Sequence, residues 1–217
     1  MDKDVSNHIR KLLEDGSFLA KDNDFLPSVD FDFSEETILI TGAAGTIGSG
    51  LIKLLLKGPF KNLILLDNAE SPLYYLQKEL EAYQKPNVHF VLTDIRDEDS
   101  MQELFSTFKP SLIFHTAAYK HVPMVEYNIA EGVANNVFGT WNAAEAARKA
   151  EVETFVLVST DKAVRPTNIM GASKRIAEMI LQGLAQRDTK TRFCMVRFGN
   201  VLGEPRHGIV GEHEAAQ

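Results

Sequence analysis

Cysteine, long apolar runs and excess positive charge are all scarce in this sequence, and each absence excludes a class of protein. The single cysteine, Cys194, cannot form an internal disulfide, which excludes a disulfide-stabilised secreted domain and indicates a reducing compartment. No apolar stretch reaches the ~18–20 residues that a membrane-spanning helix needs. The 23 Lys and Arg residues are outnumbered by 30 Asp and Glu, and the net charge of −7 argues against a nucleic-acid partner or an anionic membrane surface.

Two further absences concern targeting and metals. No signal-peptide core follows Met1-Asp2-Lys3-Asp4, so we expect a cytoplasmic protein that does not insert into a membrane. No group of His and Cys residues has the spacing of metal ligands, so no metal site is expected. The 217 residues are 44% apolar and 24% charged, which is ordinary for a globular protein and allows one sizeable domain.

From Thr37 onward, short apolar runs alternate with amphipathic segments of helical length. The expected strands are Thr37–Ile40, Asn62–Leu66, Val88–Leu92, Ser111–Phe114, Thr154–Val158 and Arg192–Phe198. The expected helices are Thr46–Lys57, Pro72–Gln84, Asp99–Phe108, Asn128–Ala150 and Ile169–Gln186. Strands that are apolar throughout are typical of a parallel sheet covered on both faces, and right-handed crossovers then predict a doubly wound α/β domain of the Rossmann type.

This pattern divides the chain into three parts. Residues 1–33 are expected to form an N-terminal arm, and residues 34–203 the Rossmann domain. Residues 204–217 form an irregular tail that has two His, three Glu and no apolar periodicity. Two interpretations of the tail compete, a flexible terminus and a chain cut before a second domain.

A glycine-rich turn follows the first expected strand and opens the first helix. Its spacing is Gly42-x-x-Gly45-x-x-Gly48. Gly42 permits the tight turn, Gly45 lets the backbone approach a pyrophosphate, and Gly48 allows the helix to pack closely on the strand. Thr46 and Ile47 begin the helix, whose free N–H groups and positive dipole end favour phosphate. The turn therefore predicts a dinucleotide site.

Acidic residues end the second and third expected strands. Asp67 lies 19 residues after Gly48, where a carboxylate can accept hydrogen bonds from the ribose hydroxyls of NAD and would repel a 2′-phosphate. No Lys or Arg follows it directly, so NAD is expected rather than NADP. Asp94 either contacts the adenine amino group or caps the next turn, and Ile95 is expected to lie against the adenine ring.

These glycines, together with His115–Pro123 (HTAAYKHVP) and Asn135–Thr140 (NNVFGT), resemble the extended short-chain dehydrogenase/reductases. The runs Ser159–Arg175 (STDKAVRPTNIMGASKR) and Val196–Gly203 resemble the UDP-N-acetylglucosamine 4,6-dehydratases of the polysaccharide-biosynthesis, capsular type. The resemblance covers Thr37 to Gly203.

Three features depart from this family. Its members continue past the position of Gly203 into a substrate-binding domain, which we expect to be missing here. Larger members carry an N-terminal membrane-spanning region. Most have Tyr-x-x-x-Lys where this sequence has Met170 and Lys174, a change that recurs in one subset of the dehydratases.

The resemblance implies an NAD-dependent reaction in which hydride leaves C4 of the sugar, water is eliminated across C5–C6, and hydride returns to C6. It implies that Lys174 holds the nicotinamide ribose and that Thr160 donates to the C4 oxygen. Asp161 is expected to protonate the C6 hydroxyl and Lys162 to take the C5 proton. Met170 cannot accept a proton and is expected to pack. The base for the 4-hydroxyl remains open between Lys174, a water, Asp161 and Lys162.

Plainer interpretations exist for several of these residues. Thr160 could cap a turn, and Asp161 with Lys162 could form an exposed ion pair. In a chain without the second domain, this pair is expected to be open to water. Other expected ligand contacts follow from the resemblance: Ala117 and Ala118 for the cofactor, and Lys120, His121, Glu126, Arg197 and Asn200 for the substrate. Glu126 is equally well explained as an acidic residue at a helix N-terminus.

The expected function is therefore an NAD-dependent 4,6-dehydratase, a lyase that acts on a UDP-sugar in surface-polysaccharide synthesis and is expected to form a homo-oligomer. A 4-epimerase or oxidoreductase of the same superfamily is the first alternative, although C4 epimerisation needs no base at C5 and leaves Asp161-Lys162 unexplained. A non-catalytic NAD-binding fragment is the second alternative, suggested by the short chain after Gly203.

Overall fold

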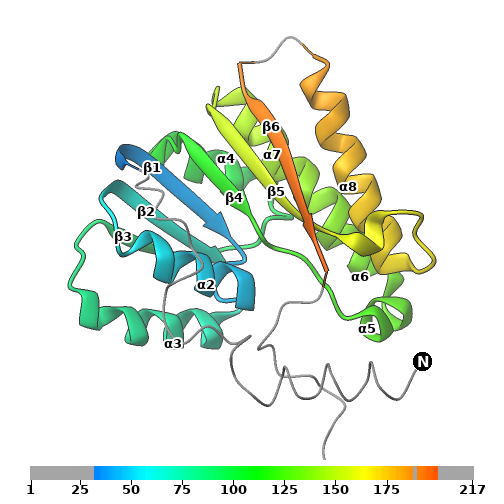
Figure 1. Cartoon of the computed structure of the whole chain (residues 1–217), viewed down its shortest axis with the longest axis horizontal. Helices are drawn as coiled ribbons and strands as arrows, with labels where there is room; N and C mark the ends of the chain where they lie inside the picture. The colour runs from blue at the N-terminus through cyan, green and yellow to red at the C-terminus, as the bar shows by residue number, and fades with distance from the viewer. Residues whose placement is uncertain (1–31, 188–189, 200–217) are drawn as a thin grey trace, which may run out of the picture. The chain divides into compact units, whose positions relative to one another are not determined.

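Six parallel strands form the centre of the molecule in the order β3-β2-β1-β4-β5-β6 (Figure 1). The computed structural model describes residues 32–187 and 190–199, so residues 1–31 of the expected arm 1–33, the tail and Asn200 lie outside the described residues. The strands are β1 (Phe33–Thr41), β2 (Phe60–Asp67), β3 (Val88–Leu92), β4 (Leu112–His115), β5 (Thr154–Thr160) and β6 (Arg192–Phe198). Five of them contain the expected strands or coincide with them, and β4 begins and ends one residue later than the expected Ser111–Phe114. The doubly wound Rossmann architecture is confirmed.

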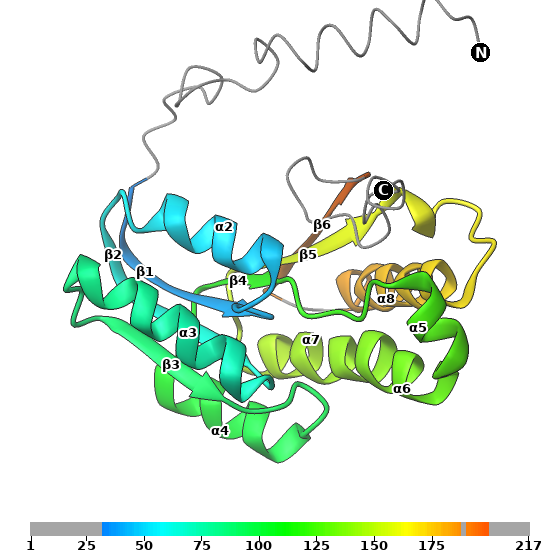
Figure 2. The same cartoon turned by 90° about the horizontal axis from the view of Figure 1, so that it is seen from below.

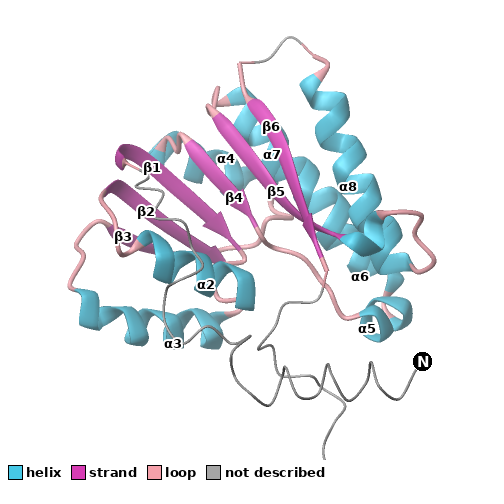
Figure 3. Cartoon of the chain, viewed as in Figure 1, coloured by secondary structure: helices cyan, strands magenta, loops and turns pink. Residues whose placement is uncertain are grey.

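Helices connect the strands and cover the sheet (Figure 3). They are α2 (Thr46–Leu55), α3 (Glu70–Leu80), α4 (Glu98–Phe108), α5 (Val122–Tyr127), α6 (Ile129–Val133), α7 (Thr140–Lys149) and α8 (Ile169–Ala185). Short 3₁₀ turns occur at η1 (Glu81–Tyr83) and η3 (Asp161–Ala163), and η2 (Ala134–Gly139) is a π-helical turn.

Alternating side chains divide the core into two layers. Ile38 and Ile40 of β1 pack with the apolar side chains of α2 and α3, whereas Leu39 packs with those of α4, α7 and α8. All three β1 residues are fully buried, as expected for a central strand covered on both faces. Figure 2 shows α2 and α7 on opposite sides of β1 and β4.

The segment after β4 departs from the expected structure. Instead of one helix over Asn128–Ala150, the chain forms α6, the π-helical turn η2 and α7. The wider turn buries three successive side chains, Asn135, Asn136 and Val137, which a regular helix would spread around its circumference. The six-residue helix α5 was not expected, because it is too short to show a helical period.

The sheet topology places the site. From β1 the chain moves outward through β2 and β3, then crosses back to β4 on the other side of β1. Ligands of such sheets bind at this reversal, beyond the carboxyl ends of the two neighbouring strands. The Thr116 N–H donates to the Thr41 carbonyl at 3.0 Å, so the residues that follow β1 and β4 lie side by side.

Candidate functional site

Three adjoining hollows form a groove along the carboxyl ends of the strands. Their volumes are about 310, 500 and 270 Å³, and all three are lined by Thr116, Ala118 and Tyr119. The first hollow reaches Asp67, and the third reaches Lys174. The groove therefore connects the residues expected to bind the cofactor with those expected to perform chemistry.

The glycine turn fits a phosphate at the middle of the groove. Gly42 has a φ of +69°, and a Cβ there would lie 2.6 Å from the Ala117 nitrogen. A Cβ on Gly48 would lie 2.3 Å from the Gly42 carbonyl oxygen, whereas one on Gly45 would meet only that oxygen, at 3.3 Å. Helix α2 begins after Gly45 with no side-chain cap and no acidic residue in its first turn. Its N-terminus is thus suited to an anion, as the spacing predicted.

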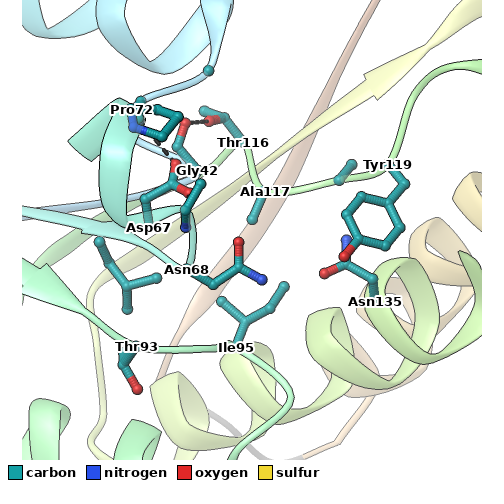
Figure 4. Close-up of a pocket in the computed structure, with 15 residues that line it drawn as sticks. Gly42, Asp67, Asn68, Pro72, Thr93, Ile95, Thr116, Ala117, Tyr119 and Asn135 are labelled. Carbon is teal, nitrogen blue, oxygen red and sulfur yellow. Dashed lines mark hydrogen bonds between the residues drawn. The ribbon is translucent and has the colours of Figure 1, made fainter. Parts of the chain in front are cut away.

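Asp67 lies in the first hollow, which Figure 4 shows in close-up. Its Oδ2 accepts a hydrogen bond from the Ala44 N–H at 2.9 Å, and its Oδ1 accepts one from the Ala69 N–H at 3.0 Å. Each carboxylate oxygen keeps a further lone pair that ribose hydroxyls could use. Among the described residues that line this hollow there is no Lys or Arg.

Asp94 and Ile95 have different surroundings. Arg96 donates to Asp94 through Nε and Nη2, at 2.9 and 2.7 Å, and Asn68 donates to it at 3.3 Å. The hydrogen bonds from Arg96 hold the pKa of Asp94 below its usual value. Asp94 thus organises its own turn, and an adenine contact stays a prediction. Ile95 is buried and lines the first hollow (Figure 4).

The third hollow gathers three residues expected to take part in the chemistry, together with Met170, which was expected to pack. Thr160, Lys162, Met170 and Lys174 all line it. Lys174 is only 5% exposed, and its Nζ donates to the Val158 carbonyl at 2.7 Å. Burial lowers the pKa of Lys174 to about 8, although the charge of Glu178 acts in the opposite direction. Met170 is buried, as expected for a packing residue.

Asp161 is half of a solvent-exposed ion pair in the turn η3. Thr160 donates to its Oδ1 at 3.0 Å, and the Lys162 Nζ donates to the same oxygen at 3.3 Å. These hydrogen bonds lower the pKa of Asp161. The side chains of Asp161 and Lys162 are 60% and 39% exposed. Thr160 also accepts from the Lys162 N–H and so caps the turn, which was the plainer interpretation of this residue.

Glu126 and Arg197 make protein contacts where substrate contacts were expected. The Glu126 Oε1 accepts from the Ile169 N–H at 2.7 Å, so Glu126 caps the start of α8 from α5. The Arg197 guanidinium donates to the buried Glu178 carboxylate on α8, at 2.6 Å through Nε. Neither residue lines the groove, and each would have to leave its partner to reach a substrate. Lys120 and His121, by contrast, line the second and third hollows.

Neither Tyr119 nor Gly171 was assigned a role of its own in the sequence analysis. Tyr119 lines all three hollows, and Asn136 holds its backbone at both polar groups, with hydrogen bonds of 2.7 and 2.9 Å. Gly171 lies where a Cβ would be 2.3 Å from the Lys162 carbonyl oxygen, so this glycine lets η3 pack against α8. The available signal was a glycine in the first turn of a helix, which costs stability and indicates close packing.

Within the described ranges, no helix is long and apolar enough to cross a bilayer. The His, Cys, Asp and Glu side chains of these ranges form no cluster of three or more that could hold a metal ion.

The sheet order, the open helix N-terminus after Gly45 and the carboxylate at the end of β2 define a Rossmann domain of the dinucleotide-binding type. The family model described as "Polysaccharide biosynthesis protein" matches residues 38–210, and the chain belongs to this family.

Two curated relatives show what the chain is similar to. It is 45% identical over 174 residues to the capsular polysaccharide biosynthesis protein CapD of Staphylococcus aureus, which covers 79% of this chain and 29% of CapD. It is 30% identical over 173 residues to the inverting UDP-N-acetylglucosamine 4,6-dehydratase of Campylobacter jejuni, covering 79% of this chain and 51% of that enzyme. The chain thus spans about half or less of the length of these relatives.

Solved structures agree with the fold. The UDP-Glc/GlcNAc 4-epimerase of Campylobacter jejuni superposes with a TM-score of 0.74 at 26% identity, over 84% of this chain and 59% of the epimerase. The enzyme WbmG of Bordetella bronchiseptica, solved with NAD and UDP, superposes with a TM-score of 0.60 at 26% identity, over 76% of this chain and 53% of WbmG.

Proposed function

We propose that this chain is the NAD-binding domain of a nucleotide-sugar 4,6-dehydratase that acts on a UDP-N-acetylhexosamine in surface-polysaccharide synthesis. The observation that carries the proposal is that Lys162, which pairs with Asp161 in η3, lines the same end of the groove as Lys174. Elimination of water across C5–C6 needs an acid and a base close together, which adjacent residues of opposite charge supply. The similarity to CapD and to a 4,6-dehydratase supports the same class of reaction.

The groove fits NAD along its whole length. The open α2 N-terminus would take the pyrophosphate, Asp67 the adenosine ribose, and Lys174 the nicotinamide ribose. Bound NAD supplies hydride acceptance and return, which the side chains of the protein cannot.

We assign Lys174 as the residue that takes the proton of the sugar 4-hydroxyl. Because burial lowers its pKa to about 8, a fraction of the side chain is neutral near neutral pH and can accept a proton. Met170 offers only a weak thioether acceptor and occupies the buried wall one helical turn earlier. Thr160 lines the same hollow, and its hydroxyl can donate to an oxygen that gains negative charge if it leaves Asp161, to which it donates at 3.0 Å in the structure.

Asp161 and Lys162 need one proton transfer to reach their working states. In the open site Asp161 is an anion, because its hydrogen bonds lower its pKa. Moving one proton from the Lys162 Nζ to the Asp161 Oδ1, which are 3.3 Å apart, produces a neutral amine and a carboxylic acid. A substrate that excludes water favours this uncharged pair. Lys162 can then take the C5 proton while Asp161 protonates the departing C6 hydroxyl.

A 4-epimerase is the second candidate, favoured by the match to the UDP-Glc/GlcNAc epimerase structure. A domain that binds NAD without turnover is the third. We also propose, from the family resemblance alone, that the protein is a cytoplasmic homo-oligomer.

Incubation with NAD and UDP-N-acetylglucosamine in D₂O, followed by NMR, separates these candidates. A dehydratase gives a 4-keto product with a C6 methyl group and deuterium at C5, whereas an epimerase leaves C6 hydroxylated and C5 protonated. NAD binding by calorimetry without either product indicates the non-catalytic domain. A product that keeps its C6 hydroxyl group, or that keeps the proton at C5, contradicts the dehydratase proposal.

Variants sharpen the assignment. Asp161→Asn and Lys162→Met should each lower dehydration by about 10²–10⁴-fold, as for lost acid–base groups. Lys149→Met is the matched control, because Lys149 is a similarly exposed lysine that pairs with Glu98 on α4, away from the groove. Equal losses in all three variants would contradict the roles given to η3.

A further inference from the structure

His115 is fully buried at the end of β4, and both of its ring nitrogens are hydrogen-bonded. Nδ1 lies 2.8 Å from the Thr41 Oγ1, and Nε2 lies 3.1 Å from the Thr140 Oγ1. Thr140 donates its own hydroxyl proton to the Asn136 carbonyl at 2.7 Å. The Thr140 oxygen can therefore only accept from His115, so Nε2 carries the proton and Nδ1 accepts from Thr41.

The Asn136 side chain makes a second set of hydrogen bonds, which reaches α8. The side chain of Asn136 holds the Tyr119 backbone and also donates to the Ser173 Oγ at 3.0 Å. Ser173 in turn donates to the Met170 carbonyl at 2.7 Å. Asn136 and Ser173 are 1% and 2% exposed, so water cannot replace these partners.

We propose that His115, fixed as the Nε2–H tautomer, is a positioning residue that ties the cofactor-binding turn to the Asn136 backbone, and through the Asn136 side chain to α8. At one end, Thr41 immediately precedes Gly42 of the glycine turn. At the other end, Ser173 immediately precedes Lys174. His115 itself touches none of the hollows, so it acts through the residues it aligns.

This hydrogen-bonded link can hold the two parts in place because it has only one stable arrangement. A buried chain in which every donor has one acceptor exists in a single arrangement, because losing one member leaves a buried polar group unpaired. The π-helical turn η2 supplies Asn136, which is buried one turn before Thr140 at the start of α7. The NAD groove and α8 are thus held in one relative position.

Calorimetric titration of NAD into Thr140 variants tests this inference, which rests on the proposed NAD binding. Thr140→Val keeps the side-chain shape and removes the oxygen that accepts from His115. The dissociation constant for NAD should rise about tenfold, in line with one unpaired buried group. Thr140→Ser restores the hydroxyl and should restore the affinity.

Thr191→Val is the matched control. Thr191 is also a buried threonine whose hydroxyl donates to a helix carbonyl, that of Ala147, but it lies just before β6. The Thr191→Val variant should lose about as much stability as Thr140→Val, but it should bind NAD with the affinity of the parent. An unchanged NAD affinity in Thr140→Val, or an equal loss in Thr191→Val, would overturn the proposal.

The tautomer offers a readout that does not depend on NAD or on activity. In ¹⁵N-histidine-labelled protein, long-range ¹H–¹⁵N correlation should show one ring protonated at Nε2 only, and Thr140→Val should shift this signal. A His115 signal protonated at Nδ1, or at both nitrogens at pH 7, would overturn the hydrogen-bonded chain. A parent protein that shows the expected tautomer and does not bind NAD would instead contradict the proposed function alone, and His115 would then have no cofactor site to position.

Discussion

Asp67 combines two tasks in one carboxylate. It accepts hydrogen bonds from the backbone N–H groups of Ala44, in the glycine turn, and of Ala69, in the turn that leads to α3. The same carboxylate lines the first hollow. Charge-assisted hydrogen bonds to backbone are among the stronger ones, so Asp67 both shapes the groove and presents negative charge to it.

We expect Asp67→Ala to weaken NAD binding about 10- to 100-fold, the loss for hydrogen bonds to a charged group. NADP should bind the parent less tightly than NAD, because Asp67 repels its 2′-phosphate, and the substitution should reduce this preference. Calorimetry with both cofactors measures the two effects. Asp97→Ala, which removes the cap of α4 outside the groove, should leave both affinities unchanged. A parent that binds NADP as tightly as NAD would contradict the role of Asp67.

At the scale of the elements, hydrogen bonds from α5 and from the residue before α8 hold the start of α8 in place. Glu126 on α5 accepts from the first N–H of α8, and Asn168 accepts from the Gly171 N–H at 2.7 Å. A carboxylate at a helix N-terminus also interacts favourably with the helix dipole. The start of the helix that carries Met170 and Lys174 is therefore fixed by a short helix that contributes to the groove.

Glu126→Ala should lower the free energy of unfolding by about 0.5–2 kcal/mol, the range for a lost helix cap. In this variant, hydrogen exchange should become faster at Ile169–Gly171. Glu126→Gln keeps an acceptor oxygen, so its exchange rates should change less. Glu103→Ala removes an exposed carboxylate from α4 and serves as the control. Unchanged exchange at the start of α8 in Glu126→Ala would show that this contact does not hold the helix.

Buried titratable groups decide how the whole molecule responds to acid. Burial, and then the charge of Lys174, lower the pKa of His115 to about 3. Burial alone would raise the pKa of Glu178, but hydrogen bonds from Arg197, Ser159 and Arg175 bring it down to about 2. Both groups therefore bind a proton more readily in the unfolded chain than in the folded protein, over different ranges of pH.

The free energy of unfolding should therefore fall as the pH decreases. For His115 the loss begins near its ordinary pKa of 6.5 and continues to about 3, and for Glu178 it runs from about 4.5 to about 2. Between pH 6.5 and 5.5, His115 contributes to this loss and Glu178 does not. The free energy of unfolding should fall by about 1 kcal/mol over this range. Urea unfolding followed by Trp141 fluorescence measures this slope. His115→Gln should flatten the slope and Thr191→Val should not, and equal slopes in parent and His115→Gln would contradict the assignment.

The sequence by itself determined the fold and the position of the cofactor turn. The doubly wound architecture follows from apolar runs that alternate with helices, and the close backbone approaches at Gly42 and Gly48 follow from the places of these glycines along the chain. These features are local, because a positive φ or a close backbone approach restricts the residue type at that one position. Apolar runs are local features as well, so the strands could be predicted from them. The short α5 and the π-helical turn have no such pattern and could not be predicted.

Only the tertiary structure decided which polar side chains are free for a ligand. Glu126 and Arg197 looked suited to a substrate, yet their partners are Ile169 and Glu178, 43 and 19 residues away along the chain. His115 attracted no functional prediction, and its partner Thr41 lies 74 residues earlier. Such pairs form only once parallel strands and their helices are aligned. A residue pattern specifies the backbone that each position needs, but not the distant group that will satisfy a donor or acceptor.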